Sequence, residues 1–478
     1  MRKITRFFDA VFLLLLLNFL VKPLWILGID RKVQLLTGEL AYGHYFSTFN
    51  FVFIFGIVAD LGLSDYLRRT IAIRNGIDKH SLMKFVQLKL MLSLFMAILV
   101  LGVGYAFGIR DITLLTGLIL LQIILGWIGA SRAVISGLQL YQTDAWLSIA
   151  DKLMLVVVGV FLLYVFPISF IRIDAFLSAQ LMSAALTFLI SVFVLVRYFK
   201  KNPFLPDAST GIATVLNDTL PFAMLFFVMS VHLRADGFLL GVMQPNTTAA
   251  GTYASMYRFL DATHVAATLV GSYLVAFWSR HLQERELLRR SLHEIFSLMV
   301  SVALAIILFV FFYADQVYEW FYHQQDGNGA NLLRWGMFAL FPYAIVSVFG
   351  SMLTAKGHLK LFIYIVLFCA ASNVVLNVFV IPTYGAIGAA FIANSTQSAL
   401  AILLFIFLRK KEQLGIAKIY LIRLLFFLAI LLVLLNILRY TYLSLFWQVF
   451  SYLVLTLITA NRLKMIPAGW RIGMIREK

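Results

Sequence analysis

Three ionisable residues lie within one long apolar stretch of the chain. The segment SVHLRADGFLLG, residues 230–241, places His232, Arg234 and Asp236 between the apolar runs PFAMLFFVM and LLGVM. A charge at membrane depth costs about 2.5–3.5 kcal/mol on insertion, so it tends to face a cavity or a partner and often marks a transport path. His232 is one helical turn from Asp236, and such a pair can take up a proton. A hydrogen-bonded packing role for His232 is the alternative.

A second group of ionisable residues follows in the next apolar stretch, where TYASMYRFLDATH contains Arg258, Asp261 and His264. At a rise of about 1.5 Å per residue on two antiparallel helices, Arg258 is level with Asp236, about 12 Å deep. Arg234 is level with Asp261 at about 15 Å. Two crossed ion pairs would fasten the helices together. However, residues 234 and 236 lie about 200° apart around a helix, so both cannot face the neighbour. At least one arginine offered to a substrate is the other interpretation.

The composition indicates which elements hold these residues. Of the 478 residues, 62% are hydrophobic and 13% are charged, whereas soluble domains carry about 25% charged residues. Apolar stretches of about 20 residues recur along the chain, as in proteins with many transmembrane helices. We therefore expect an all-α polytopic membrane protein with about 14 spans. The predicted spans are 7–28, 42–66, 84–107, 112–133, 146–167, 173–197, 215–243, 250–278, 293–313, 332–354, 360–381, 386–408, 419–438 and 441–460.

The basic residues predict the orientation. Loops and tails on the side of the two termini carry about four times as many Lys and Arg as those on the other side, which predicts cytoplasmic termini. The net charge of +17 then reflects this bias and attraction to anionic lipid rather than nucleic-acid binding. The basic and apolar start lacks a cleavage site and is interpreted as a retained first span. The single cysteine, Cys369, allows no internal disulfide. No metal or cofactor motif is found, so none is predicted.

The chain resembles itself at an offset of about 210 residues. AYGHYFSTFN enters the second predicted span, and AAGTYASMYR enters the eighth, each with a Gly-x-Tyr motif. This predicts two parallel six-helix halves, 1–200 and 201–412, followed by an extra helix pair and cytoplasmic tail at 413–478. Transporters built from such repeats bind their substrate between the halves and alternate access by rocking.

Three further blocks carry a resemblance to a known family. They are GELAYGHYFSTFNFVFIFGIVADLGLSDYLRRTIA (38–72), RADGFLLGVMQPNTTAAGTYASMYR (234–258) and NVVLNVFVIPTYGAIGAAFIANS (373–395). In this order, on a frame of 14 spans, they resemble the MOP superfamily within its polysaccharide-transporter branch, which includes O-antigen and other lipid-linked oligosaccharide flippases. The resemblance covers nearly the whole chain.

The resemblance implies a fold and a function. It implies two six-helix bundles around a cationic central cavity, through which a polyprenyl-pyrophosphate-linked oligosaccharide crosses the bacterial cytoplasmic (inner) membrane by alternating access, for surface polysaccharide assembly. Drug and toxin exporters of the superfamily usually stop at 12 spans, so the extra pair favours a flippase. A cation-coupled exporter of small amphiphilic molecules is the alternative. We expect a monomer that meets the lipid bilayer, its lipid-linked substrate and glycosyltransferases or a polymerase of the same pathway, and that is not itself an enzyme, because the loops are short and lack a placed acidic pair.

The resemblance also implies candidate substrate-binding residues. In the similar lipid II flippases, cavity arginines hold the pyrophosphate, and Arg258 matches one of them early in the eighth helix. Arg31 and Lys32 match others only approximately. Because the polar link GIDRKVQLL between the first two spans departs from the family's pattern, Lys22 is a further candidate. Arg234 completes the set.

The chemistry of a diphosphate favours arginine at such a site. The planar guanidinium bonds two phosphate oxygens at once. Asp236 and Asp261 are expected to hold the arginines between cycles, and His232 and His264 are the candidates for coupling to protons. Lys89, about one turn into the third predicted span, is expected to extend to the cytoplasmic surface.

Overall fold

The structure, a computed structural model, describes residues 16–18, 20–74, 76–165, 167, 170–206, 212–244, 246–323, 327–441 and 444–466. Most of the first predicted span, 7–15, lies outside the described residues. In the described part the regular structure is helical, without a β-strand. The later predicted spans lie in helical segments, although 42–66 and 332–354 each extend over more than one helix, and ten helices of the described part are long and apolar enough to cross a membrane. The predicted all-α polytopic membrane fold is confirmed.

The chain divides into two compact units, which are described separately. Unit 1 comprises Met1–Ala254 and Val374–Ala386, and unit 2 comprises Ser255–Asn373 and Ile387–Lys478. This division follows compactness rather than sequence repetition, so the predicted halves 1–200 and 201–412 stay a prediction.

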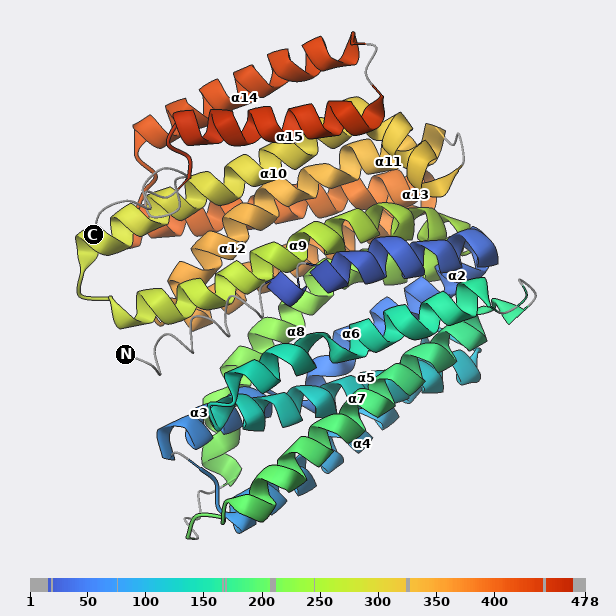
Figure 1. Cartoon of the computed structure of the whole chain (residues 1–478), viewed down its shortest axis with the longest axis vertical. Coiled ribbons are helices and arrows are strands. Elements are labelled where there is room, and N and C mark those ends of the chain that lie inside the picture. Colours follow the sequence, from blue (N-terminus) through green and yellow to red (C-terminus); the bar gives the residue numbers. More distant parts are fainter. Residues whose placement is uncertain are drawn as a thin grey trace. The chain divides into compact units, whose positions relative to one another are not determined.

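In unit 1, α2 packs along α8, and α5 packs between α3 and α7 (Figure 1). The helix α6 lies against α7. The elements of this unit are η1 (Leu24–Asp30), α2 (Arg31–Phe55), η2 (Gly56–Ala59), α3 (Leu63–Arg74), α4 (Lys79–Ala106), α5 (Ile112–Gly137), α6 (Tyr141–Tyr164), α7 (Ile173–Lys201) and α8 (Ile212–Met243), with the first turns of α9 (Thr248–Arg280).

In unit 2, α10 is the central helix, because it packs against α11, α12 and α14. The last helix, α15, lies against α14, so the predicted extra pair forms a hairpin (Figure 1). The remaining elements are α10 (Arg285–Tyr322), α11 (Gly327–Gly336), η4 (Met337–Ala339), α12 (Leu340–Ala355), α13 (Leu359–Lys411), α14 (Lys418–Arg439) and α15 (Leu445–Arg462).

Two links predicted from sequence differ in the structure. The segment GIDRKVQLL is helical throughout, within η1 and α2, and the chain turns only at Gly38, where φ is 84°. The predicted spans 360–381 and 386–408 are both part of α13, which breaks at Gly385 with φ 53°. A helical residue 385 would donate its N–H to the Ile381 carbonyl. The break frees that carbonyl, which accepts the side-chain amide of Gln244 instead.

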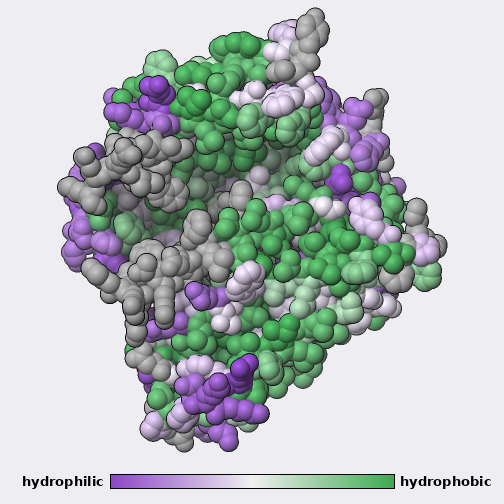
Figure 2. Space-filling view, viewed as in Figure 1, coloured by the Kyte–Doolittle hydropathy of each residue, from purple (hydrophilic) through white to green (hydrophobic). Residues whose placement is uncertain are grey.

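Large apolar side chains are exposed along the membrane-length helices. On α4 they include Leu90, Met91, Leu94, Phe95 and Ile98. Figure 2 shows hydrophobic side chains over broad parts of the visible surface, with hydrophilic ones gathered in separate groups. An exposed apolar surface of this extent fits contact with lipid.

Candidate functional site

Arg234 lies in the middle of α8 and packs against α2 within unit 1. Its guanidinium carbon is 4.8 Å from the centre of the Phe53 ring, and its Nη1 donates to the Asn50 side-chain oxygen at 3.4 Å. The side chain is partly exposed. A guanidinium over an aromatic face is held there by cation–π attraction.

Asp236, two residues later, is enclosed by hydrogen bonds. It is 2% exposed. Asn377 of α13 donates to its Oδ1 at 2.7 Å, and the Tyr253 hydroxyl donates to its Oδ2 at 3.3 Å. All three residues belong to unit 1. Neutral donors stabilise a buried carboxylate at this depth. The predicted pairing of Asp236 with Arg258 stays a prediction.

Arg258 belongs to unit 2 and is 4% exposed. Its Nη1 donates to the Tyr322 hydroxyl at 3.3 Å, and that hydroxyl donates to the Ser255 carbonyl at 3.1 Å. Tyr322 ends α10, so the end of one helix positions an arginine of another. The tyrosine hydroxyl therefore helps to orient the arginine.

The other predicted coupling and pairing residues are placed as follows. His232 is 3% exposed on α8. Asp261 is partly exposed on α9. His264 lies on the same helix, and its side chain is outside the described part. The predicted partnership of Arg234 with Asp261 stays a prediction.

The cationic candidates of the first helical segment are in unit 1. The Lys32 ammonium lies 3.9 Å from the centre of the Tyr164 ring. Arg31 is the first residue of α2, and its side chain is partly exposed. Lys22 lies near enough to Asp151 to be attracted by it.

The sequence analysis missed four charged residues on α5 and α6. Arg132 of α5 pairs with Asp144 of α6, with Nε and Oδ1 2.8 Å apart. Asp151 and Lys152, in the middle of α6, are 3.1 Å apart. Lys22 interacts electrostatically with Asp151, Lys152 and Arg132. The run TDAWLSIADK could have indicated these residues, because it places two aspartates seven residues, or two helical turns, apart at the start of a predicted membrane span.

The prediction for Lys89 is wrong. Instead of reaching the surface, its side chain is 0% exposed and forms an ion pair with Asp60. The chain leaves η2 through Asp60 and Leu61, which has a φ of 45°, and this break turns the carboxylate towards α4. Asp60 also accepts a hydrogen bond from the Ser64 hydroxyl at 2.5 Å.

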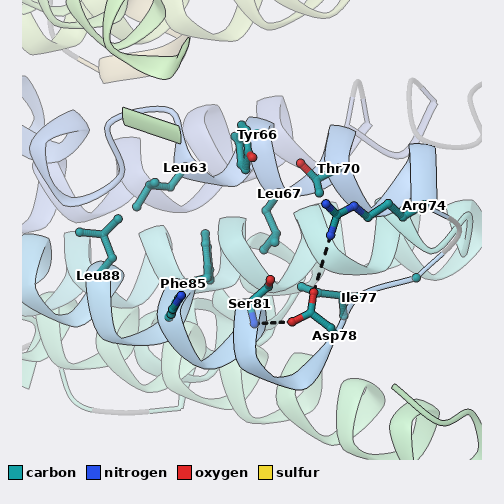
Figure 3. Close-up of a pocket in the computed structure, with 12 residues that line it drawn as sticks. Leu63, Tyr66, Leu67, Thr70, Arg74, Ile77, Asp78, Ser81, Phe85 and Leu88 are labelled. Carbon is teal, nitrogen blue, oxygen red and sulfur yellow. Dashed lines mark hydrogen bonds and ion pairs between the residues drawn. The ribbon is translucent and has the colours of Figure 1, made fainter. Parts of the chain in front are cut away.

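A small pocket, lined mainly by apolar side chains, lies at the junction of α3 and α4 (Figure 3). Asp78 caps α4 by accepting the Ser81 N–H at 2.7 Å, and Arg74 lies 3.7 Å from its other oxygen. Burial alone would raise the pKa of Asp78, but the hydrogen bonds from Ser81 and the charge of Arg74 outweigh it and hold that pKa below its usual range. The pocket wall also contains Leu63, Tyr66, Leu67, Thr70, Ile77, Phe85 and Leu88.

Solved structures of membrane transporters are similar to this chain, whereas no protein-family model and no curated protein sequence matches it. The lipid II flippase MurJ, in an inward closed conformation, aligns with a TM-score of 0.66 at 14% identity, over 96% of this chain and 98% of its own. A multidrug resistance MATE family transporter of the MOP superfamily, facing outward, aligns at 0.63 and 17% identity, over 84% and 94%. An inward-facing structure of a multidrug resistance MATE family transporter aligns at a TM-score of 0.61 and 15% identity, over 83% of this chain and 94% of its own.

At these identities the likeness is one of fold. The chain has the fold of these transporter structures.

Proposed function

We propose that this protein is a flippase that moves a polyprenyl-pyrophosphate-linked oligosaccharide across the bacterial cytoplasmic membrane by alternating access. The polyprenyl tail can stay in the lipid, while the diphosphate needs cationic groups to cross. We propose that Arg258 and Arg234 bind the diphosphate, with Lys22, Arg31 and Lys32 as further contacts.

The alignment over the whole chain is the observation that carries this proposal. The flippase alignment covers 96% of the chain, whereas the outward-facing exporter alignment covers 84%. The difference is close to the share of the chain in 413–478, which contains the hairpin of α14 and α15. A lipid-linked substrate is therefore favoured over a small amphiphilic molecule.

The intramembrane cations support the same choice. Arg258 is fastened by the neutral hydroxyl of Tyr322, and Arg234 by the amide of Asn50 and the ring of Phe53. These contacts orient both guanidinium groups. A cationic surface attracts a diphosphate and repels the cationic drugs that many exporters carry.

The test is surface glycan export by a host that depends on this chain. Replacing Arg258→Ala should abolish export while the folded protein still reaches the membrane in normal amount. Arg280→Ala, at the exposed end of the same helix, is the matched control and should export normally. Normal export by the Arg258→Ala variant would refute the role assigned to this arginine.

The alternative function is cation-coupled export of small amphiphilic molecules. The exporter structures at TM-scores of 0.61 and 0.63 favour it. Under this alternative, the purified protein in vesicles would extrude amphiphilic dyes, and transport would respond to an imposed pH gradient through His232 and Asp236. Dye extrusion together with unaffected glycan export in a deletion strain would replace our proposal.

A further inference from the structure

Two ion pairs lie on α5 and α6 of unit 1, helices that the sequence analysis left out of the site, and the candidate Lys22 lies near them. Arg132 pairs with Asp144, and Lys152 pairs with Asp151. The segment that contains Lys22 runs along α6, because Asn18 donates to the Ser148 hydroxyl at 2.8 Å. Of these five charged residues, three are cationic and two are anionic, so the group has an excess of one positive charge. The Lys152 ammonium also lies 5.9 Å from the centre of the Trp25 ring.

The helix α6 shows which way these charges face. Its large exposed apolar residues form one stripe that includes Trp146, Leu153, Val157 and Tyr164. At 100° per residue, Asp151 lies about 140° from Trp146 in one direction around the helix, and Lys152 lies about 120° from it in the other direction. Both residues are therefore on the half of the helix opposite the stripe. The stripe therefore faces lipid, while both charges face the protein.

Lys152 lies inside the predicted span 146–167, six residues or about 9 Å from its start. Its side chain is nevertheless 26% exposed, and that of Arg132, near the end of the predicted span 112–133, is 28% exposed. Since a charge that faces hydrocarbon is costly, we expect the exposed part of Lys152 to open towards polar space on the protein-facing side of α6.

We propose that Arg132 and Lys152, together with Lys22, which the proposed function already names as a further contact, form a second anion-binding site, which takes one phosphate or carboxylate group of the transported headgroup. Asp151 and Asp144 compete with this anion and hold the cations when it is absent. The excess of one positive charge matches one such group. The inference deepens the proposed function and rests on it only for the identity of the transported substrate.

Binding to the purified full-length protein tests the site without transport. Two probes are titrated: sodium pyrophosphate represents a lipid-linked diphosphate, and glucuronate represents an acidic sugar. Binding is measured by tryptophan fluorescence, and the part of the signal that comes from Trp25 is identified by its loss in a Trp25→Phe variant. We expect saturable binding of at least one probe. Lys152→Gln should raise its Kd at least tenfold, and Lys152→Arg should keep it within about threefold.

Asp151→Asn separates anion binding from a structural role. If Asp151 competes with the anion, this variant binds the probe several-fold more tightly than wild type, whereas loss of a purely structural ion pair would weaken or abolish binding. Lys201→Gln, at the exposed end of α7, is the matched control and should bind as wild type does. If pyrophosphate binds more tightly than glucuronate, the site is assigned to the diphosphate. If glucuronate binds more tightly than pyrophosphate, the site is assigned to an acidic sugar.

The inference is overturned if wild type binds neither probe, if Lys152→Gln binds with wild-type affinity, or if Asp151→Asn binds more weakly. Any of these results, together with lost export in Arg258→Ala, would leave the proposed function standing without this site. Conversely, the expected binding series together with normal export in Arg258→Ala would retain the site and remove the proposed role of Arg258.

Discussion

Gly43 and Gly251, the glycines of the two repeated Gly-x-Tyr motifs, pack backbone against backbone within unit 1. A β-carbon on Gly43 would lie 2.7 Å from the Gly251 nitrogen, and one on Gly251 would lie 2.9 Å from the Cα of Glu39. The contact is fastened on both sides, because Gln34 donates to the Gly251 carbonyl at 2.9 Å and Thr247 donates to the Leu40 carbonyl at 2.7 Å. The repeated motif is therefore a site of helix contact.

Gly43→Ala should destabilise the protein by about 1–3 kcal/mol, because the new methyl group meets rigid backbone and the helices must separate. A lower melting temperature of the detergent-purified protein would show this. Gly102 on α4 is the control, since a β-carbon there would meet nothing within 4 Å. Gly102→Ala should be neutral or stabilise by up to about 1 kcal/mol. Equal melting temperatures for Gly43→Ala and wild type would contradict the close contact.

The Asp60–Lys89 ion pair should respond asymmetrically to mutation. Asp60→Asn leaves a lysine that is 0% exposed without its counter-charge, which should cost about 3 kcal/mol. Lys89→Met should cost less, because Asp60 is 22% exposed and water can reach it. The double variant should recover stability relative to Asp60→Asn. Thermal melting of the four proteins measures the coupling, and additive losses would argue against a direct pair.

Tyr322→Phe should lower glycan export by about three- to tenfold, because a typical hydrogen bond contributes about 1 kcal/mol net and this one orients Arg258. The phenylalanine keeps the ring and removes only the hydroxyl that joins Arg258 to Ser255. Export per amount of folded protein is the measurement. Tyr440→Phe, at an exposed tyrosine, is the control. Undiminished export by Tyr322→Phe would mean that this hydroxyl does not position Arg258.

Asp78 should make stability depend on acid pH. Because the fold holds the Asp78 pKa below that of the unfolded chain, the carboxylate stabilises the fold fully above about pH 5. This contribution disappears as the pH falls through the unfolded value, about 3.9, towards the lowered folded value. Asp78→Asn keeps an acceptor for Ser81 but cannot titrate.

The melting temperature of wild type should therefore exceed that of Asp78→Asn near neutral pH, and the gap should close as the pH approaches 3. A gap that stays constant from pH 7 to pH 3 would show that the charge of Asp78 adds nothing to its role as a helix cap.

The sequence predicted the class of fold and the places of the membrane helices well, but it predicted the environment of the charges less well. Arg258 and Asp236 were found as intramembrane charges because an ionisable residue in an apolar run is visible locally. Lys152 lies in an equally apolar run, yet its role depends on Lys22, more than a hundred residues earlier. The prediction for Lys89 was wrong because a helix break places its partner, Asp60, next to it, and no local sequence pattern predicts that break.

The amino-acid sequence alone determined that this chain is a bundle of membrane-spanning helices, because hydrophobic length is a property of consecutive residues and the bilayer selects for it. Only the tertiary structure decided the partner of each buried polar group. Asp236 and Asn377 stand 141 positions apart and share a hydrogen bond, while Asp236 and Arg234, two positions apart, have different neighbours. These pairings depend on how the helices pack. A charge in a low-dielectric interior needs hydrogen-bond donors, and the fold determines which donors lie near it.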